Sequence, residues 1–155
     1  PEAYWSTKPS QTVDPGKALL VCERGVQIEV QAISTQLRGW QQIPVETMHI
    51  HQRYSDVPLT KLKVPTLDGF SAMKLTAWFD RGASRDLFDL EGLTHLRSLS
   101  ENTKTLVTEL LGLKLTRRML DRKIYGVWQD DLAHQAKLDM TEEECLTRVL
   151  EWWEK

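Results

Sequence analysis

The chain has 155 residues, of which 41% are hydrophobic and 27% are charged, and this balance is typical of one soluble globular domain. That composition argues against a chain that is disordered along its whole length. The 20 basic and 22 acidic residues give a formal net charge of −2, which argues against a protein that coats nucleic acid by charge alone.

The N-terminal part of the chain predicts β-structure. Residues 1–17 combine Pro, Ser, Thr, Gly and Gln, so we expect an irregular lead-in. Two apolar runs, residues 18–22 and 26–30, flank a turn at Gly25 and predict a β-hairpin. Glu29 lies in the second run and, by alternation, on the face opposite to the apolar side chains of that strand.

Two further short strands are predicted at residues 45–50 and 59–64. Prolines bound both segments, as is common for edge strands and extended connections. Residues 1–65 are therefore expected to form a β-rich portion of the protein.

From residue 66 onward the pattern becomes helical. We expect a first helix that is capped by Thr66 or Asp68 and runs to about residue 80, and further helices over residues 85–96, 100–111, 116–137 and 141–153. Gly82 ends the first of them as a C-terminal glycine does, and Ser84 is expected to cap the second. Thr141 and Glu144 form a capping box at the start of the last helix, while Gly126 is a weak point in the fourth.

The order of these elements predicts an α+β fold, because the strands precede the helices and do not alternate with them. We therefore expect a helical domain over residues 66–155, following the β-rich portion over residues 1–65. A basic stretch lies within the helical domain and forms either a phosphate-contacting surface or a solvated face. Its members are Lys114, Arg117, Arg118, Arg122 and Lys123.

Charged residues gather around the junction of the first two predicted helices. Lys74 shares a helix face with aromatic residues, so it must either snorkel to water or find an anion, and Arg81 lies two turns further on nearly the same face. Asp86 and Asp89 border the apolar side of the second helix, where Arg85 and Asp89 form an i, i+4 pair. An ordinary helix–helix elbow explains this pattern as well as a functional site does, because acids are favoured near helix N-termini and pair with nearby cations.

Residues 74–90, KLTAWFDRGASRDLFDL, resemble the signature of the AbiEii/AbiGii family of nucleotidyltransferase toxins. That signature is a helix carrying Lys, a small apolar segment, an Arg-Gly elbow and then Arg-Asp-x-x-Asp-Leu. The matching residues are Lys74, Ala77, Arg81, Gly82, Arg85, Asp86, Asp89 and Leu90. The resemblance extends over most of residues 18–155 and is most specific over residues 64–93.

The resemblance implies nucleotidyl transfer of the polymerase-β type. The hairpin and short strands would be the remnant of that core, followed by a helical bundle. A nucleoside triphosphate would donate the nucleotide, two Mg²⁺ ions would assist, and tRNA or another RNA would accept it. The family also implies a cognate antitoxin, in a type IV toxin–antitoxin pair or in abortive phage infection.

The same resemblance assigns roles to the charged residues. Lys74 would contact the nucleotide phosphates as a point charge. Asp86 and Asp89 would be the acids of the last motif. Arg81 and Arg85 would hold the elbow or assist with phosphate.

The resemblance extends to an acid in the predicted hairpin, but the family's metal-binding motif is missing. Glu29 matches a strand acid of the family, with an exposed strand residue as the alternative. The family opens with a Gly-Gly-Ser/Thr helix start and an Asp-x-Asp strand, which carry most of its metal binding, and neither is present in the sequence. We therefore expect either a fragment or a shortened relative that is inactive alone. The alternative to a transferase is a catalytically inactive module that retains the fold for protein or RNA contact.

Metal, disulfide and membrane signals are weak. Cys22 and Cys145 lie far apart and outside any Cys-x-x-Cys spacing, and His49 and His51 have no acidic or thiol partner at metal-ligand spacing, so we predict no metal site. No apolar stretch approaches the roughly 20 residues of a membrane span, and the first residues lack the apolar core of a signal peptide. We expect a cytoplasmic protein, and the sequence leaves its oligomeric state open.

Overall fold

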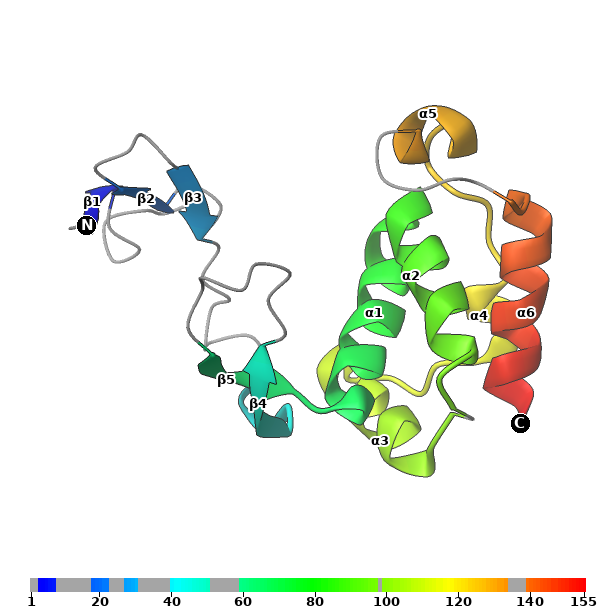
Figure 1. Ribbon diagram of the computed structural model, residues 1–155. Helices are drawn as coiled ribbons and strands as arrows, with labels where there is room; N and C mark the ends of the chain where they lie inside the picture. Colours follow the sequence, from blue (N-terminus) through cyan, green and yellow to red (C-terminus); the bar gives the residue numbers. More distant parts are fainter. Residues whose placement is uncertain are drawn as a thin grey trace. The chain divides into compact units, whose positions relative to one another are not determined.

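The computed structural model describes residues 3–7, 18–22, 27–30, 40–50, 59–97, 99–133 and 139–155 (Figure 1). The chain divides into two compact units, Pro1–Leu37 and Arg38–Lys155. Among the described residues, no helix is both long enough and apolar enough to cross a membrane.

The first unit contains a three-stranded antiparallel sheet of order β1-β2-β3. Its strands are β1 (Ala3–Thr7), β2 (Ala18–Cys22) and β3 (Gln27–Val30). The predicted hairpin is confirmed as β2 and β3, in which Glu29 is the register partner of Leu19. The expected irregular lead-in is wrong over β1, because the sequence AYWST has the aromatic and β-branched residues that suit a strand and pairs with the free edge of β2.

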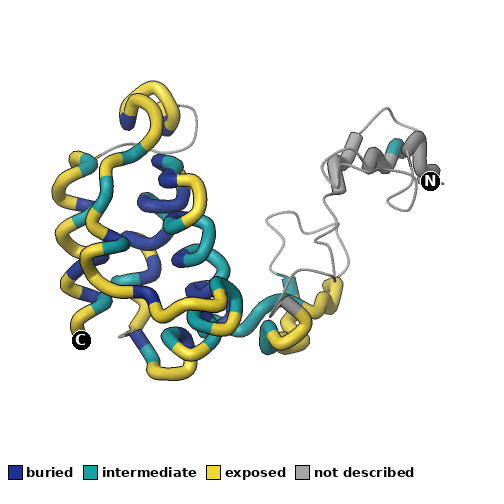
Figure 2. The backbone as a smooth tube through the Cα atoms, turned by 180° about the vertical axis from the view of Figure 1, so that it is seen from behind, coloured by how far each residue is buried: buried dark blue, intermediate teal, exposed yellow. Residues whose placement is uncertain are grey.

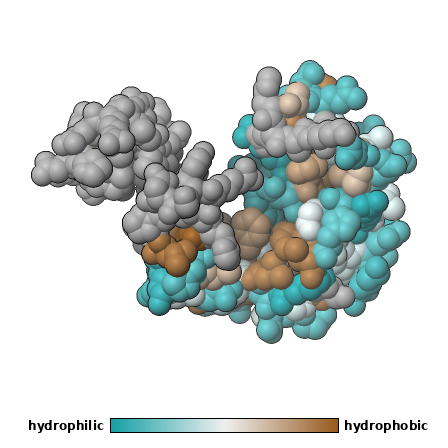
Figure 3. Space-filling view, in the orientation of Figure 1, coloured by the Kyte–Doolittle hydropathy of each residue, from teal (hydrophilic) through white to brown (hydrophobic). Residues whose placement is uncertain are grey.

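The second unit begins with a short 3₁₀ helix, η3 (Trp40–Gln42), and an antiparallel hairpin of β4 (Val45–Ile50) and β5 (Thr60–Pro65). The two predicted strands are thereby confirmed. Met48 and Leu62 are register partners and stay about half exposed, and Figure 3 shows hydrophobic residues at the surface of this hairpin.

Six helices follow β5 within the described residues of the second unit. They are α1 (Leu67–Arg81), α2 (Ser84–Thr94), α3 (Glu101–Leu111), α4 (Arg117–Leu120), α5 (Trp128–Leu132) and α6 (Glu142–Glu154). Helix α1 packs against α2 and α3, and α2 packs against α6. Their facing sides carry the buried residues, which Figure 2 shows in dark blue along the inner faces of the helices. Trp78, Leu75, Leu87 and Leu90 are fully buried in this core.

Local capping signals set most of the helix ends. The Thr66 side chain accepts a hydrogen bond from Gly69 N, and Ser100 and Thr141 cap α3 and α6 in the same way. The predicted capping box is confirmed, and the hydrogen bonds from Thr141 lower the pKa of Glu144. Ser84 is not the cap that we expected. Ala83 occupies the cap position, and the Ser84 hydroxyl instead donates to Asp131 Oδ2 at 2.7 Å.

The fourth predicted helix, over residues 116–137, is wrong. Of residues 116–133, the part of this range that the structure describes, only the single turn of α4 and the short α5 are helical. Asp121 leaves the helical region with φ −77° and ψ 81°, and Gly126 has a φ of 140°. Hydrogen bonds between this segment and the C-terminal end of α1 take the place of helical ones.

Strands followed by helices confirm the α+β fold. The hairpin of β4 and β5 lies in the same compact unit as the helices, and Thr66 N donates to Pro44 O at 2.9 Å where the hairpin meets α1. Whether residues 66–155 also behave as a separate domain stays a prediction.

Candidate functional site

The junction between α1 and α2 is a tight elbow. Gly82 follows the last residue of α1 with φ 58° and ψ 35°, the left-handed conformation that glycine adopts without strain. Its N–H donates to Trp78 O at 2.9 Å, which closes the last turn of α1. Because α2 begins two residues later, the end of α1 lies beside the first turns of α2.

Asp86, in the first turn of α2, is fully buried and is held by two cations from α1. Arg81 donates from Nε to Asp86 Oδ2 at 2.6 Å and from Nη2 to Oδ1 at 2.8 Å, a two-point contact that matches the shape of a carboxylate. Lys74 Nζ lies 3.7 Å from the same Oδ1. The hydrogen bonds to Asp86 raise the pKa of the Arg81 guanidinium. A buried carboxylate is tolerated here because cations contact both of its oxygens.

Asp89 lies one turn further along α2 and completes the cluster. Lys74 Nζ donates to Asp89 Oδ2 at 2.5 Å, and the two side chains are 22% and 42% exposed. The Phe70 ring lies beside the same ammonium, with its centroid 5.6 Å from Nζ. The sequence left open whether Lys74 extends to water or pairs with an anion, and in the structure it pairs with Asp89. We call Lys74, Arg81, Asp86 and Asp89 the elbow cluster.

Two predicted site residues lie outside the elbow cluster. Arg85 is exposed on α2, and the expected pair with Asp89 is wrong, because the Asp89 carboxylate turns toward Lys74 on the neighbouring helix. Arg85 forms no ion pair within the part of the chain that the structure describes. Glu29 belongs to the other compact unit, and its side chain lies outside the described residues.

The charges of the elbow cluster balance, with two cations facing two carboxylates. Both Asp86 oxygens are already bound by cations, so this carboxylate does not fit the role of a Mg²⁺ ligand. No group of three or more His, Cys, Asp or Glu side chains among the described residues is placed to hold a metal ion. The contact between Lys74 and Asp89 is the part of the cluster that lies partly open to water, whereas Asp86 is fully buried.

Two residues of the predicted basic stretch make contacts within the protein. Arg117 Nε pairs with Glu154 Oε1 at 2.9 Å. Arg122 turns toward α1 and donates to Phe79 O. Whether the five residues contact phosphate or form a solvated face stays a prediction.

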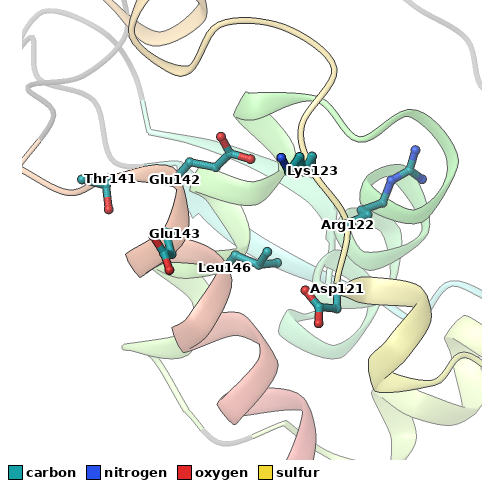
Figure 4. A pocket seen from close by; sticks show the side chains of 7 residues that line it. All are labelled: Asp121, Arg122, Lys123, Thr141, Glu142, Glu143 and Leu146. Atoms are coloured by element: carbon teal, nitrogen blue, oxygen red, sulfur yellow. The ribbon is translucent and has the colours of Figure 1, made fainter.

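A cavity of about 850 Å³ lies between the segment after α4 and the start of α6. It is lined by Asp121, Arg122, Lys123, Thr141, Glu142, Glu143 and Leu146. Figure 4 shows the Arg122 side chain pointing away from Leu146 and Glu143. Acids and bases mix along this wall, which gives it no single charge preference.

The described residues thus form an α+β chain in which a lysine, an arginine and two carboxylates meet at the elbow between α1 and α2. The sequence model described as "Nucleotidyl transferase AbiEii toxin, Type IV TA system" matches residues 25–146. The matched range is most of the chain and includes the whole elbow cluster, so the chain belongs to the AbiEii family of nucleotidyl transferase toxins. No curated protein and no solved structure matches it. A type IV toxin–antitoxin system pairs such a toxin with an antitoxin.

Proposed function

We propose that the elbow cluster binds the phosphates of a nucleoside triphosphate and that Lys74 is the phosphate ligand. The observation that carries the proposal is the partly exposed contact between Lys74 Nζ and Asp89. The carboxylate occupies the place of an anion, and a phosphate group can take that place with more charge and more acceptor oxygens.

The other members of the cluster divide into binding and positioning roles. Asp86, bound from both sides, holds Lys74 and Arg81 in place. Arg81 is 61% exposed along its side chain, so its remaining donors can reach a second phosphate oxygen. Arg85 is an exposed cation that can join it, and Asp89 moves aside when the nucleotide binds.

The metal-binding part of the reaction belongs to other residues. The sequence contains no Asp-x-Asp pair, and Asp86 is already engaged by cations. We therefore propose that this chain alone does not hold the Mg²⁺ pair and is inactive as a transferase by itself. Glu29 remains a candidate for a further catalytic carboxylate.

The family supplies the rest of the proposed reaction. The nucleotide passes from the triphosphate to an acceptor such as tRNA or another RNA, and a cognate antitoxin restrains the toxin. The cytoplasm, where nucleoside triphosphates, tRNA and a co-expressed antitoxin meet, is the proposed location.

Isothermal titration tests the phosphate site. The unaltered chain is titrated with ATP, GTP, CTP and UTP in Mg²⁺, next to Lys74→Ala and to Lys61→Ala, an exposed lysine on β5 outside the cluster and outside the basic stretch. We expect Lys74→Ala to weaken binding about 10- to 100-fold, the worth of one charge-assisted contact, and Lys61→Ala to leave it unchanged. Equal binding by all three proteins, or no binding of any nucleotide by the unaltered chain, contradicts the proposal.

The second candidate function is a catalytically inactive binding module. The mutual neutralisation of the two cations and two carboxylates favours it, because a cluster with satisfied charges can serve packing alone. A module of this kind binds RNA or protein without nucleotide and does not add labelled nucleotide to RNA. Filter binding of tRNA with and without nucleoside triphosphate, followed by an incorporation assay, separates the two candidates.

A further inference from the structure

The segment between α4 and α5 crosses the C-terminal end of α1 instead of continuing as a helix. Trp78 Nε1, buried in α1, donates to Leu120 O at 3.0 Å. Five residues after Leu120, Tyr125 N donates to Gly82 O at 2.9 Å. We call residues 120–125 the strap. Two hydrogen bonds join the strap to the end of α1: Leu120 O accepts one and Gly82 O accepts the other.

Arg122 forms the third link in the middle of the strap. Its Nη1 donates to Phe79 O, and its guanidinium lies 4.8 Å from the centre of the Tyr125 ring. Both side chains lie close against Gly82, where a Cβ atom would be 3.1 Å from Tyr125 Cδ2 and 3.2 Å from Arg122 Nε. The guanidinium thus covers the elbow glycine on the side that has no side chain.

The end of a helix explains why these contacts form. The last carbonyls of an α-helix have no partner within the helix and carry its partial negative charge. Trp78 O is satisfied by Gly82 N, while Phe79 O and Gly82 O receive their donors from the strap. A guanidinium is well suited to this place because it is always charged and presents several N–H groups in one plane.

The strap acts on the elbow cluster through the backbone. Arg81 lies between two of the strapped residues, Phe79 and Gly82, and more than half of its side chain is exposed. Its orientation therefore depends on the backbone at the elbow and on Asp86. A change in the Gly82 conformation would turn the first residues of α2 and move Asp86 away from Arg81.

We propose that Arg122 is a positioning residue for the elbow cluster. By holding the elbow, it fixes the contact between Arg81 and Asp86, and through the buried carboxylate it fixes Lys74. The functional meaning of this role rests on the proposed phosphate site. The mechanical link between Arg122 and the Arg81–Asp86 contact does not, and it is measured separately.

The first test reads the Arg81 Nε–H signal by ¹H–¹⁵N NMR of the whole chain, with the signal assigned from an Arg81→Lys variant. In the unaltered protein this N–H donates to a buried carboxylate, so its signal is shifted and exchanges slowly with water. Arg122→Ala is expected to move the signal toward that of a free arginine and to speed its exchange. Arg118→Ala, which removes an exposed charge from α4, is expected to leave it unchanged.

The indole N–H of Trp78 reports whether the fold survives, because it is buried and bonded to the strap backbone. An unchanged Arg81 signal in a folded Arg122→Ala protein overturns the proposal, since Arg122 would then cap α1 without positioning Arg81.

If Arg122→Ala does not fold, the Tyr125→Ala variant tests the same proposal. The Tyr125 side chain is mostly exposed, so its loss spares the core but frees Arg122 from its ring. We expect a smaller shift of the Arg81 signal in the same direction, and no shift overturns the proposal.

Nucleotide titration of the same variants separates this inference from the proposed function. We expect Arg122→Ala to weaken triphosphate binding about fivefold or more, with the Lys61→Ala control unchanged. A moved Arg81 signal in a chain that binds no nucleotide means that the strap positions the cluster while the phosphate-site proposal fails. An unmoved signal with intact nucleotide binding means that the phosphate site stands and the positioning role fails.

Discussion

Lys74 Nζ on α1 lies 2.5 Å from Asp89 Oδ2 on α2, and both side chains are partly open to water. Asp86, three residues earlier on α2, binds the same ammonium from the buried side at 3.7 Å. The two carboxylates therefore differ in what surrounds them, although both contact one lysine. The buried carboxylate is fixed by Arg81, and the proposed phosphate site requires that the exposed carboxylate gives way to phosphate. Replacing each aspartate by asparagine should therefore have a different effect: Asp89→Asn should change triphosphate binding, and Asp86→Asn should change the stability of the fold.

Asp89→Asn is expected to strengthen triphosphate binding. The substitution removes the negative charge that competes with phosphate for Lys74 while it keeps the size of the side chain. Because a partly exposed ion pair is worth up to about 1 kcal/mol, the affinity should rise by up to about fivefold. Titration of the variant measures this, with Glu109→Gln on the exposed side of α3 as a charge-matched control. A loss of affinity in Asp89→Asn would instead make Asp89 a ligand of the nucleotide.

Asp86→Asn is expected to destabilise the fold. The substitution leaves the Arg81 and Lys74 cations without their buried counter-charge, and breaking a buried pair of this kind costs about 3–5 kcal/mol. Since more than half of the Arg81 side chain reaches water, we expect the lower end of that range. Urea unfolding compares the variant with Asp89→Asn, which should lose about 1 kcal/mol or less. Equal losses would mean that Asp86 is no more important to the fold than an exposed acid.

Gly82→Ala tests the elbow itself. Any residue with a Cβ is strained at a φ of 58°, at a cost of about 1–2 kcal/mol. The added atom would also press on Tyr125 and Arg122 of the strap. We expect a lower free energy of unfolding and a displaced Arg81 Nε–H signal.

Gly92→Ala is the matched control for this substitution. Gly92 lies within α2, and nothing is within 4 Å of the place where its Cβ would be. Alanine there should stabilise the protein by about 0.5–1 kcal/mol, because it favours the helix over the unfolded chain. A Gly82→Ala protein as stable as the unaltered one would show that the elbow does not need its left-handed glycine.

The sequence predicts those features of the elbow that depend on local signals. Thr66 and Gly82 mark the ends of α1 because a capping hydroxyl and a left-handed glycine act within a few residues. The helical spacing also places Lys74 and Arg81 on one face, and the structure brings both to the carboxylates of α2. The spacing does not predict which carboxylate pairs with Lys74 and which with Arg81, because the pairing depends on how closely α1 and α2 approach each other.

The strap could not be predicted, for a related reason. Residues 116–137 have enough helical pattern to predict one long helix, with only Gly126 against it. The chain leaves the helix at Asp121 because its donors and acceptors find partners in α1, 42 and 43 positions away in the sequence. Such long-range hydrogen bonds override local propensity and leave no local signal. Arg122 supplies an N–H donor to Phe79 O at the C-terminal end of α1, but its position in the sequence does not indicate this distant partner.

Cys145 on α6 gives a pH-dependent prediction away from the elbow. The thiol is fully buried, and desolvation raises its pKa from 9.0 to about 11. A raised thiol pKa favours the neutral form in the folded state, so its stabilising effect is complete below pH 9 and is lost as the pH rises from 9 to 11. Two pKa units correspond to about 2–3 kcal/mol. The difference in free energy of unfolding between the unaltered chain and Cys145→Ala should therefore shrink over this range.

Alkylation checks the same burial at neutral pH. In a Cys22→Ser background, Cys145 is the one remaining thiol of the sequence, and iodoacetamide should modify it slowly in buffer and quickly in urea. The cysteine thiolate is the nucleophile, and both burial and a raised pKa keep its concentration low in the folded protein. Rapid modification in buffer, at the rate of the unfolded chain, would mean that α6 opens readily from α2. In the unfolding experiment, a difference between the unaltered chain and Cys145→Ala that stays constant from pH 9 to 11 would mean that the thiol titrates as it does in water.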